Sequence, residues 1–252
     1  MDDIDISAPR TALVTGANKG IGHEIARRLA TLGMTVFLGS RDPVRGAEAA
    51  AALRAAGHDV RPVTLDVTDR AIVDAAAAHL AGTVDRLDVL VNNAGVAGGS
   101  GALAPSTAVP DEVVDVFATN VFGVLAVTNA MLPLLRRSAA ARIVNVSSDV
   151  GSIGQMTDPD HYLSRMPASA GYAVSKTALN ALTVQYAKDL RAEGILVNAA
   201  APGACLTDFT RHLGLPLTRT AADGAAIAVR LATLGADGTT GGFFDDDGPV
   251  PW

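Results

Sequence analysis

Short apolar runs alternate with longer alanine-rich stretches along the 252-residue chain. The first run, Ala12–Val14, has the composition of a strand that is covered on both faces. The stretch after it repeats Ile21, Ile25 and Leu29 at every fourth position, which puts them on one side of a helix that Gly33 would end. Further strands are predicted at Thr35–Leu38, Val60–Leu65, Leu87–Val91, Arg142–Val146, Ile195–Ala200 and Gly242–Phe244.

Helical stretches separate these strands. They include Pro43–Ala56, Asp69–Leu80 and a longer one, about Asp111–Arg137, that must adjust at Pro133. This alternation predicts an α/β fold: a Rossmann-type doubly wound, mainly parallel seven-stranded sheet with helices on both faces. The chain contains no internal repeat, low-complexity linker or charge run that would divide it, so we expect a single domain over residues 1–252.

Three glycines, Gly16, Gly20 and Gly22, lie between the first strand and the first helix. Without a Cβ atom the backbone can turn sharply and approach a ligand closely, and the free N–H groups of a helix start suit a phosphate. The spacing is G-x-x-x-G-x-G rather than the commoner G-x-G-x-x-G of dinucleotide sites. A nucleotide site is one interpretation, and a turn that only packs helix against strand is the other.

Polar and glycine residues follow four of the predicted strands. In parallel sheets, ligands bind beyond the carboxyl ends of the strands, so these residues predict a binding cleft at that edge. They are Asp66, then Asn92, Asn93 and Gly95, then Ser147 and Ser148, and finally Pro202 and Gly203.

Composition narrows the possible partners. Hydrophobic residues make up 49% of the chain, enough for a large core, and the net charge of -6 argues against a nucleic-acid partner. The amino-terminal segment MDDIDISAPR lacks the pattern of a secretory signal, and no uncharged apolar run is expected to approach the roughly 20 residues that span a bilayer. The single cysteine, Cys205, excludes an internal disulfide. We therefore expect a cytoplasmic protein with no membrane partner.

The segment SAGYAVSK, Ser169–Lys176, carries candidate acid–base chemistry. If its helix continues to Glu193 and stops at Gly194, Tyr172 and Lys176 lie one turn apart on the same face. Tyrosine has a pKa of about 10, and a nearby ammonium would lower it by about 2 to 3 units toward neutrality. The alternative is a surface Tyr–Lys pair on an amphipathic helix.

A series of motifs, taken together, resembles the short-chain dehydrogenase/reductase family over nearly the whole chain. The resemblance implies a nicotinamide dinucleotide cofactor and hydride transfer between it and a carbonyl or alcohol. In chain order the motifs are TGANKGIG at Thr15–Gly22, LDV at Leu65–Val67, NNAG at Asn92–Gly95, Asn120, VNVSS at Val144–Ser148, YAVSK at Tyr172–Lys176 and PGACLTD at Pro202–Asp208.

The resemblance implies a role for each catalytic candidate. Tyr172 would give its proton to the carbonyl oxygen, and Ser148 would hydrogen-bond that oxygen and stabilise its negative charge. Lys176 would lower the tyrosine pKa and hold the nicotinamide ribose. Asn120 would bend its helix and position a water molecule in a proton relay. Ser147 competes with Ser148, since strand alternation sends the two to opposite faces.

Cofactor contacts are implied in the same way. Asp66 and Val67 would flank the adenine, Asn92 would line the cofactor edge, and the backbone of Gly203–Cys205 with Thr207 would meet the carboxamide. Cys205 is expected to be a packed wall residue, and no metal site is expected. The full set is Gly16, Asn18, Lys19, Gly20, Ile21, Gly22, Arg41, Asp66, Val67, Asn92, Ala94, Gly95, Tyr172, Lys176, Pro202, Gly203, Cys205 and Thr207.

The region after the second strand favours NADP(H). Arg41 stands where NAD sites usually carry an acid, Arg45 follows one turn later, and Lys19 lies in the glycine loop. Such cations would bind a 2′-phosphate, with arginine offering two parallel donors. In the alternative, these charges only face solvent and Asp42 binds the ribose of NAD.

Tyr172 follows Ser148 by 24 positions, about twice the interval usual in the family. Carbonyl reductases of the family also carry an insertion here, so the resemblance is closest to that type. We expect the insertion, about residues 149–171, to wall a pocket for a small-molecule carbonyl substrate and to disfavour the usual tetramer. A monomer is favoured and a dimer or tetramer remains possible; sedimentation as a stable tetramer would contradict this expectation.

Apolar residues of the insertion are expected to line that pocket. They are Met156, Tyr162, Leu163 and Met166, whereas His161 faces either the substrate or solvent. A lid over about residues 208–219 would oppose them, with Phe209–Leu217 as its body and Gly214 and Pro216 shaping it.

Three functions are compared. An NADPH-dependent carbonyl reductase is the leading interpretation. An NAD(P)-dependent alcohol dehydrogenase that works in the oxidative direction is the first alternative. A dinucleotide-binding sensor without catalysis is the second. Such a sensor need not keep Ser148, Tyr172 and Lys176 together, whereas this sequence has all three.

Overall fold

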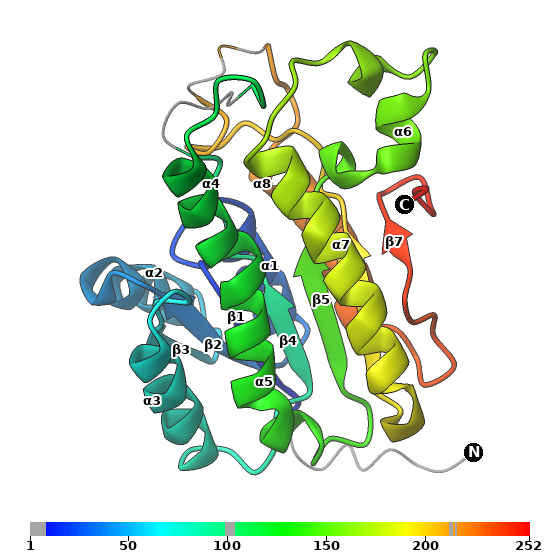
Figure 1. The fold of residues 1–252 in the computed structure, drawn as a ribbon. Helices are drawn as coiled ribbons and strands as arrows, with labels where there is room; N and C mark the ends of the chain where they lie inside the picture. Colours follow the sequence, from blue (N-terminus) through cyan, green and yellow to red (C-terminus); the bar gives the residue numbers. More distant parts are fainter. Residues whose placement is uncertain (1–8, 99–103, 212–213, 215) are drawn as a thin grey trace.

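A seven-stranded sheet forms the centre of the molecule in a computed structural model that describes residues 9–98, 104–211, 214 and 216–252 (Figure 1). All neighbouring strands pair in parallel, in the order β3-β2-β1-β4-β5-β6-β7. The strands are β1 (Thr11–Val14), β2 (Thr35–Ser40), β3 (Val60–Thr64), β4 (Val89–Asn92), β5 (Arg142–Val146), β6 (Leu196–Ala200) and β7 (Phe243–Phe244). The predicted fold class is therefore confirmed, with strand ends displaced by two residues or fewer.

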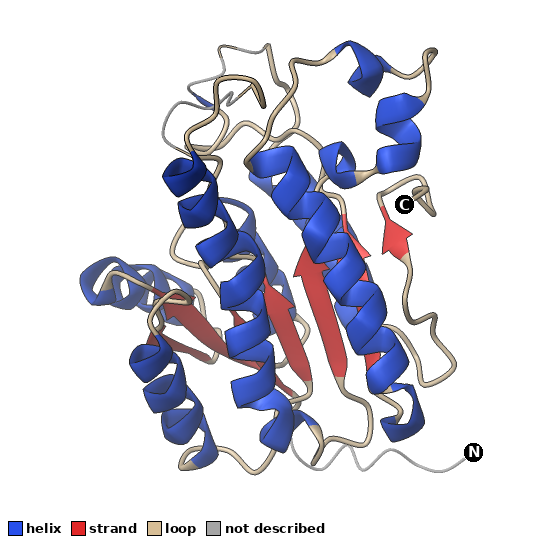
Figure 2. Cartoon of the chain, in the orientation of Figure 1, coloured by secondary structure: helices blue, strands red, loops and turns tan. Residues whose placement is uncertain are grey.

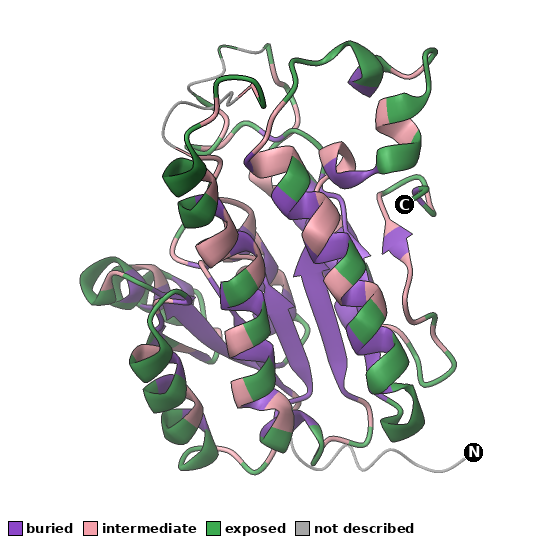
Figure 3. Cartoon of the chain, viewed as in Figure 1, coloured by how far each residue is buried: buried purple, intermediate pink, exposed green. Residues whose placement is uncertain are grey.

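Helices cover both faces of the sheet (Figure 2). One face packs against α1 (Gly20–Thr31), α2 (Pro43–Ala55) and α8 (Ala221–Ala232), and the other against α3 (Arg70–Ala81), α5 (Gly123–Leu135) and α7 (Tyr172–Asp189). Strand alternation produces the two cores: Ala12 and Val14 contribute to the first, and Leu13 contributes to the second. The strands are buried almost throughout, as parallel strands between two helical layers must be (Figure 3).

The long predicted helix has an irregular turn at a different place from the one expected. It comprises α4 (Pro110–Phe117), a π-helical turn (Ala118–Phe122) and α5. At Pro133 the helix is not interrupted, since α5 continues to Leu135; an adjustment of the helix there stays a prediction. A proline this close to a helix end removes a hydrogen bond with few turns left to disturb. The π turn instead contains Asn120, and such turns often mark functional sites.

The expectation that no apolar run approaches membrane-spanning length is also wrong. Val116–Leu135 contains no charged residue. Among the described residues, the helical stretch Pro110–Leu135 is long enough and apolar enough to cross a bilayer, judged by length and composition alone. Its inner face packs on the sheet through Val127, Met131 and Leu134. The core helix of a globular domain satisfies the same criterion.

The predicted insertion forms a short 3-10 turn (Asp149–Gly151), α6 (Ile153–Thr157) and a second 3-10 turn (Tyr162–Arg165). Residues after β7 anchor it: Gly154 N–H donates to Trp252 O at 2.8 Å, and Ser152 Oγ donates to Pro251 O at 2.5 Å. The insertion therefore lies beside the carboxyl end of the sheet, next to α7 (Figure 1).

Candidate active site

The glycine turn after β1 is a place where no side chain fits. Gly16 and Gly20 both have φ of 61°, in the left-handed region that favours glycine. A Cβ on Gly16 would lie 2.9 Å from Ala94 Cα, and one on Gly22 would lie 2.7 Å from Gly16 O. The turn thus brings bare backbone to the start of α1, where the helix dipole favours a negatively charged group.

Asn93, which the sequence analysis did not assign a role, holds this turn in place. Its Nδ2 donates to Thr15 O at 2.9 Å and to Gly16 O at 3.1 Å. Thr15 Oγ1 in turn accepts from Asn93 N–H and Ala94 N–H, both at 2.9 Å. The NNAG motif contains both asparagines, and sequence alone does not separate the buried role of Asn92 from the role of Asn93 at the glycine turn.

Asn92, which was expected to line the cofactor edge, uses its side-chain amide in a buried polar network. It is 2% exposed, and its Nδ2 donates to Thr128 Oγ1 at 3.1 Å and to Asn145 Oδ1 at 2.9 Å. Asn145 Nδ2 continues this buried polar network to Thr183 Oγ1 at 2.8 Å. The network joins β4 and β5 to α5 and α7 through Asn92 Nδ2, whereas Asn92 Oδ1 is buried without a hydrogen-bond partner among the described residues. A cofactor contact of Asn92 stays a prediction.

The two serines after β5 point to different environments. Ser147 is 2% exposed and donates to Asn180 Oδ1 at 2.6 Å, inside the α7 layer. Ser148 is half-buried, hydrogen-bonds the Tyr172 side chain and donates to Asp149 Oδ1 at 2.9 Å. Of the two, only Ser148 contacts the Tyr172 side chain.

Tyr172 begins α7, and Lys176 lies one turn further along. Lys176 is 4% exposed, and its Nζ donates to Val146 O at 2.8 Å and lies 5.6 Å from the centroid of the Tyr172 ring. The ring of Phe209 also lies 5.5 Å from that of Tyr172. The pair predicted from i,i+4 spacing is therefore real and partly enclosed.

Burial changes the acidity of both groups. The pKa of Tyr172 is raised well above its ordinary value, first by burial and then by the charge of Asp149, while the Ser148 hydrogen bond lowers it. The expected lowering of the tyrosine pKa is therefore wrong for the protein on its own, because burial raises it and the Ser148 hydrogen bond lowers it less. Burial likewise lowers the pKa of Lys176 to about 8.

Asn120, in the π-helical turn before α5, contacts Ser175 of α7 and Val96 after β4. Its Nδ2 donates to Ser175 Oγ at 3.0 Å and to Val96 O at 2.9 Å, and its Oδ1 accepts from Val96 N–H at 2.9 Å. A Cβ on Gly95 would lie 3.3 Å from Asn120 Oδ1 and 3.6 Å from Lys176 Nζ. The structure therefore brings Asn120 and Lys176 to the same side of the NNAG segment.

The three cations predicted near a 2′-phosphate differ in their pairing. Lys19 Nζ lies 3.0 Å from Asp208 Oδ2 of the lid segment, and Arg45 Nε lies 3.3 Å from Asp42 Oδ2. Arg41 is exposed and takes part in none of the ion pairs within residues 9–98, 104–211, 214 and 216–252. The end of β2 thus presents an unpaired guanidinium.

After β3, Asp66 and Val67 form the next part of the edge. Asp66 Oδ1 accepts from the N–H and the hydroxyl of Thr68, at 3.0 Å and 2.7 Å. Val67 is 8% exposed and packs closely against Gly123: a Cβ added to Gly123 would lie only 2.7 Å from Val67 Cγ2. Val67 therefore borders the π turn, and a contact of either residue with adenine stays a prediction.

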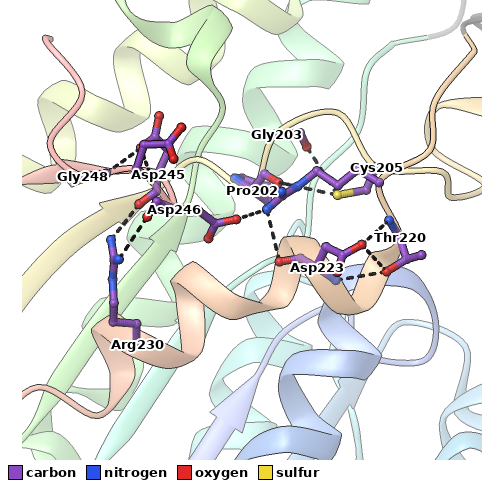
Figure 4. Close-up of polar contacts among 11 residues, drawn as sticks. Pro202, Gly203, Cys205, Thr220, Asp223, Arg230, Asp245, Asp246 and Gly248 are labelled. Atoms are coloured by element: carbon purple, nitrogen blue, oxygen red, sulfur yellow. Dashed lines mark hydrogen bonds and ion pairs between the residues drawn. The ribbon is translucent and has the colours of Figure 1, made fainter.

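Arg219, for which the sequence predicts no role, holds the segment after β6 through Pro202 and Leu206. Its Nε donates to Pro202 O at 2.8 Å, its own carbonyl accepts from Leu206 N–H at 2.7 Å, and its guanidinium pairs with Asp246. Figure 4 shows this cluster around Pro202, Asp223 and Asp246. Arg230 contacts the acidic loop after β7, Asp245–Gly248, by donating to Asp245 O at 2.7 Å. The Pro202–Cys205 segment is thus tied to α8 and to the loop after β7.

Cys205 and Thr207 complete that segment. Cys205 is 2% exposed, and burial raises the pKa of its thiol, which suits the expected wall residue rather than a nucleophile. Thr207 Cγ2 lies 3.8 Å from the position of a Cβ on Gly20. The segment after β6 therefore lies next to the glycine turn.

The apolar residues predicted to line a substrate pocket differ in exposure, and that lining stays a prediction. Leu163 is buried, Met156 is half-buried, and Tyr162 and Met166 are 56% and 45% exposed. Phe209 is the one predicted lid residue with a described ring contact to Tyr172. Residues 212, 213 and 215 of the predicted lid lie outside the described residues.

Comparisons with known proteins agree over most of the chain. A profile of the family described as "short chain dehydrogenase" matches residues 10–216. The short-chain dehydrogenase anuI of Penicillium roqueforti is 35% identical, over 93% of this chain and 93% of its own length. The (-)-isopiperitenone reductase of Mentha piperita is 34% identical, over 94% and 96%. The NADPH-bound carbonyl reductase from chicken fatty liver has a TM-score of 0.82 at 31% identity, over 97% of this chain and 99% of that one.

Proposed function

Because the chain belongs to the short-chain dehydrogenase/reductase family, we propose that it is an NADPH-dependent reductase that converts a ketone or aldehyde to an alcohol. The observation that carries this proposal is the meeting of Ser148, Tyr172 and Lys176 at the carboxyl edge of the sheet. The test is to follow NADPH absorbance with a panel of aldehydes, quinones, diketones and ketoesters. Turnover of at least one class is expected, and none with any of them would contradict the proposal.

The residues present fit a nicotinamide dinucleotide. The bare glycine turn would hold the pyrophosphate, Arg41 the 2′-phosphate, and Lys176 the nicotinamide ribose. The segment Pro202–Thr207 would border the nicotinamide. When bound, the cofactor supplies the hydride.

The chain's own residues act on the carbonyl oxygen. Tyr172, whose raised pKa keeps the phenol protonated near neutrality, gives a proton to that oxygen. Ser148 donates a hydrogen bond to the same oxygen and stabilises its growing negative charge. Asn120 keeps Val96 and Ser175 in place around Lys176. These roles favour reduction, because a protonated phenol is the form that reduction requires.

Lys176 sets the expected pH dependence. With its pKa lowered to about 8, kcat/KM for a neutral ketone should be steady on the acid side and fall as pH rises through 8, since the ammonium is lost. The measurement is kcat/KM with NADPH from pH 6 to 10. Between pH 8 and the ordinary lysine pKa of about 10.4, the unfolded chain holds more protons than the folded one, so the Lys176 contribution to stability rises with pH there. A rise of reductive kcat/KM through pH 8 would contradict this assignment.

Cofactor choice is expected to depend on Arg41. Asp42 cannot readily serve NAD, because its Oδ1 accepts from the N–H groups of Val44 and Arg45 at the start of α2 and its Oδ2 faces Arg45. Replacing Arg41 with alanine should raise KM for NADPH about 10- to 100-fold and leave KM for NADH nearly unchanged. Arg70→Ala, on α3 and paired with Asp74, is the matched control. A wild-type protein that prefers NADH would overturn the NADP assignment.

Arg219 is expected to position the Pro202–Cys205 segment. Arg219→Ala should raise KM for NADPH about tenfold, because it frees Pro202 O and leaves Asp246 without its partner. Arg230→Ala is the control, since it loosens the same acidic loop without touching Pro202. Equal effects of the two substitutions on KM would show that loop packing alone is responsible.

The alternatives are separated by simple measurements. An alcohol dehydrogenase working toward oxidation would prefer the oxidised cofactor and would gain activity at high pH, where the phenol loses its proton. A dinucleotide-binding sensor would bind NADPH without turnover of any carbonyl or alcohol. A cytoplasmic location and a monomeric state stay proposals.

A further inference from the structure

Asp149, directly after the candidate catalytic serine, adds a carboxylate to the site. Its Oδ1 accepts from Ser148 Oγ at 2.9 Å and from Val150 N–H at 3.0 Å, and its Oδ2 accepts from the hydroxyl of Tyr162. None of the ion pairs in the described part of the chain involves Asp149. Its charge is therefore held in the site by hydrogen bonds and not by a direct ion pair with a described residue.

The carboxylate lies close to where the reacting oxygen must be. That oxygen accepts a hydrogen bond from Ser148 Oγ, and Asp149 Oδ1 is 2.9 Å from the same atom. Two hydrogen-bond lengths place the two oxygens within about 6 Å of one another. The same proximity appears at Tyr172, whose pKa the charge of Asp149 raises.

Substrate binding changes the hydrogen bonds of Asp149. The Ser148 hydroxyl has one proton, and donating it to a carbonyl oxygen removes it from Asp149 Oδ1. Val150 N–H and the Tyr162 hydroxyl still donate, so one acceptor position of the carboxylate opens toward the substrate. A substrate N–H or O–H donor next to the carbonyl would fill it, and a positive charge there would also offset the repulsion between Asp149 and the developing negative oxygen.

Resting on the proposed reductase function, we propose that Asp149 selects substrates by charge, favouring ketones with an ammonium group near the carbonyl over neutral ones and rejecting ketones with a carboxylate there. Tyr162 is a positioning residue, because it holds Oδ2 from the second 3-10 turn of the insertion. The insertion thereby takes part in substrate choice through a polar contact as well as through its apolar residues.

The test uses three ketones of one shape that carry an ammonium, a hydroxyl or a carboxylate group beside the carbonyl. For the wild-type protein, kcat/KM with NADPH should fall in that order, with the cationic ketone about tenfold or more above the anionic one. Asp149→Asn keeps the side-chain shape and the Oδ1 acceptor, and it should collapse this ratio toward one. Tyr162→Phe retains the charge and should keep the cationic ketone ahead.

Binding is measured alongside turnover. Calorimetric titration of the NADP-loaded protein with the three corresponding alcohols should give the same order of affinity, and Asp149→Asn should remove it while leaving the NADPH dissociation constant unchanged. Absence of turnover with every ketone would contradict the reductase function, and the alcohol titrations would still decide the charge selection. An unchanged ratio in Asp149→Asn, or tighter binding of the anionic alcohol by the wild type, would overturn the proposal.

Discussion

Tyr172→Phe is expected to lower kcat/KM for carbonyl reduction about a thousandfold while NADPH binding stays within a factor of about two or three. The substitution removes only the hydroxyl, so the ring keeps its contacts with Phe209 and with Lys176 Nζ. The hydroxyl is the proton donor in the proposed chemistry, and within the cleft Ser148 is its hydrogen-bond partner. The measurements are steady-state kinetics and fluorescence titration with NADPH.

Tyr186 offers the matched control. It lies on the same helix and is 6% exposed, and its hydroxyl donates to Asn129 Oδ1 at 2.7 Å, away from the cleft. Tyr186→Phe should cost about 1 kcal/mol of stability and leave kcat/KM almost unchanged. If Tyr172→Phe reduces ketones as well as the parent does, the proton donor is another group and the assignment of Tyr172 fails.

Gly22→Ala is expected to destabilise the protein by about 3 to 5 kcal/mol and to abolish NADPH binding at ordinary concentrations. The added Cβ would lie 2.3 Å from Asn93 Nδ2 and 2.7 Å from Gly16 O, so the side chain of Asn93 must leave. Its departure breaks the two hydrogen bonds that hold Thr15 O and Gly16 O. Chemical denaturation and NADPH titration measure the two effects.

A glycine at the end of α3 provides the comparison. A Cβ on Gly82 would meet its nearest neighbour, Ala78 O, at 3.6 Å, and the backbone there has φ of -83°. Gly82→Ala should therefore leave both stability and NADPH affinity within experimental error. A Gly22→Ala protein that melts and binds like Gly82→Ala would show that the turn tolerates a side chain, which is incompatible with its proposed contact to the cofactor.

The sequence pattern predicted the parts of the molecule that depend on local periodicity. Apolar runs located the strands, and their alternation with helices implied a parallel sheet whose carboxyl ends share one edge. Spacing also placed Tyr172 and Lys176 on one helical face, because 3.6 residues per turn settles that question without any tertiary contact. The resemblance added Ser148 and Asn120, whose side chains the structure places beside Tyr172 and Ser175, at the start of α7.

The features that escaped prediction depend on long-range packing. Burial raises the pKa of Tyr172, and no sequence pattern reports that loss of solvation. Asp149 reaches Tyr162 across an insertion of irregular structure. The contact of Arg219 with Pro202 likewise joins segments that neither periodicity nor motif spacing relates.

The buried amides of Asn92 and Asn145 fix the axial positions of α5 and α7 relative to each other. Thr128 ties α5 and Thr183 ties α7 to the same height, so axial sliding of either helix would strand a buried amide. Asn120 and Lys176 then stand about 12 Å and 10 Å above that height by helical rise alone. An interior redesigned with aliphatic residues in these places would lose this vertical alignment even if its melting temperature increased.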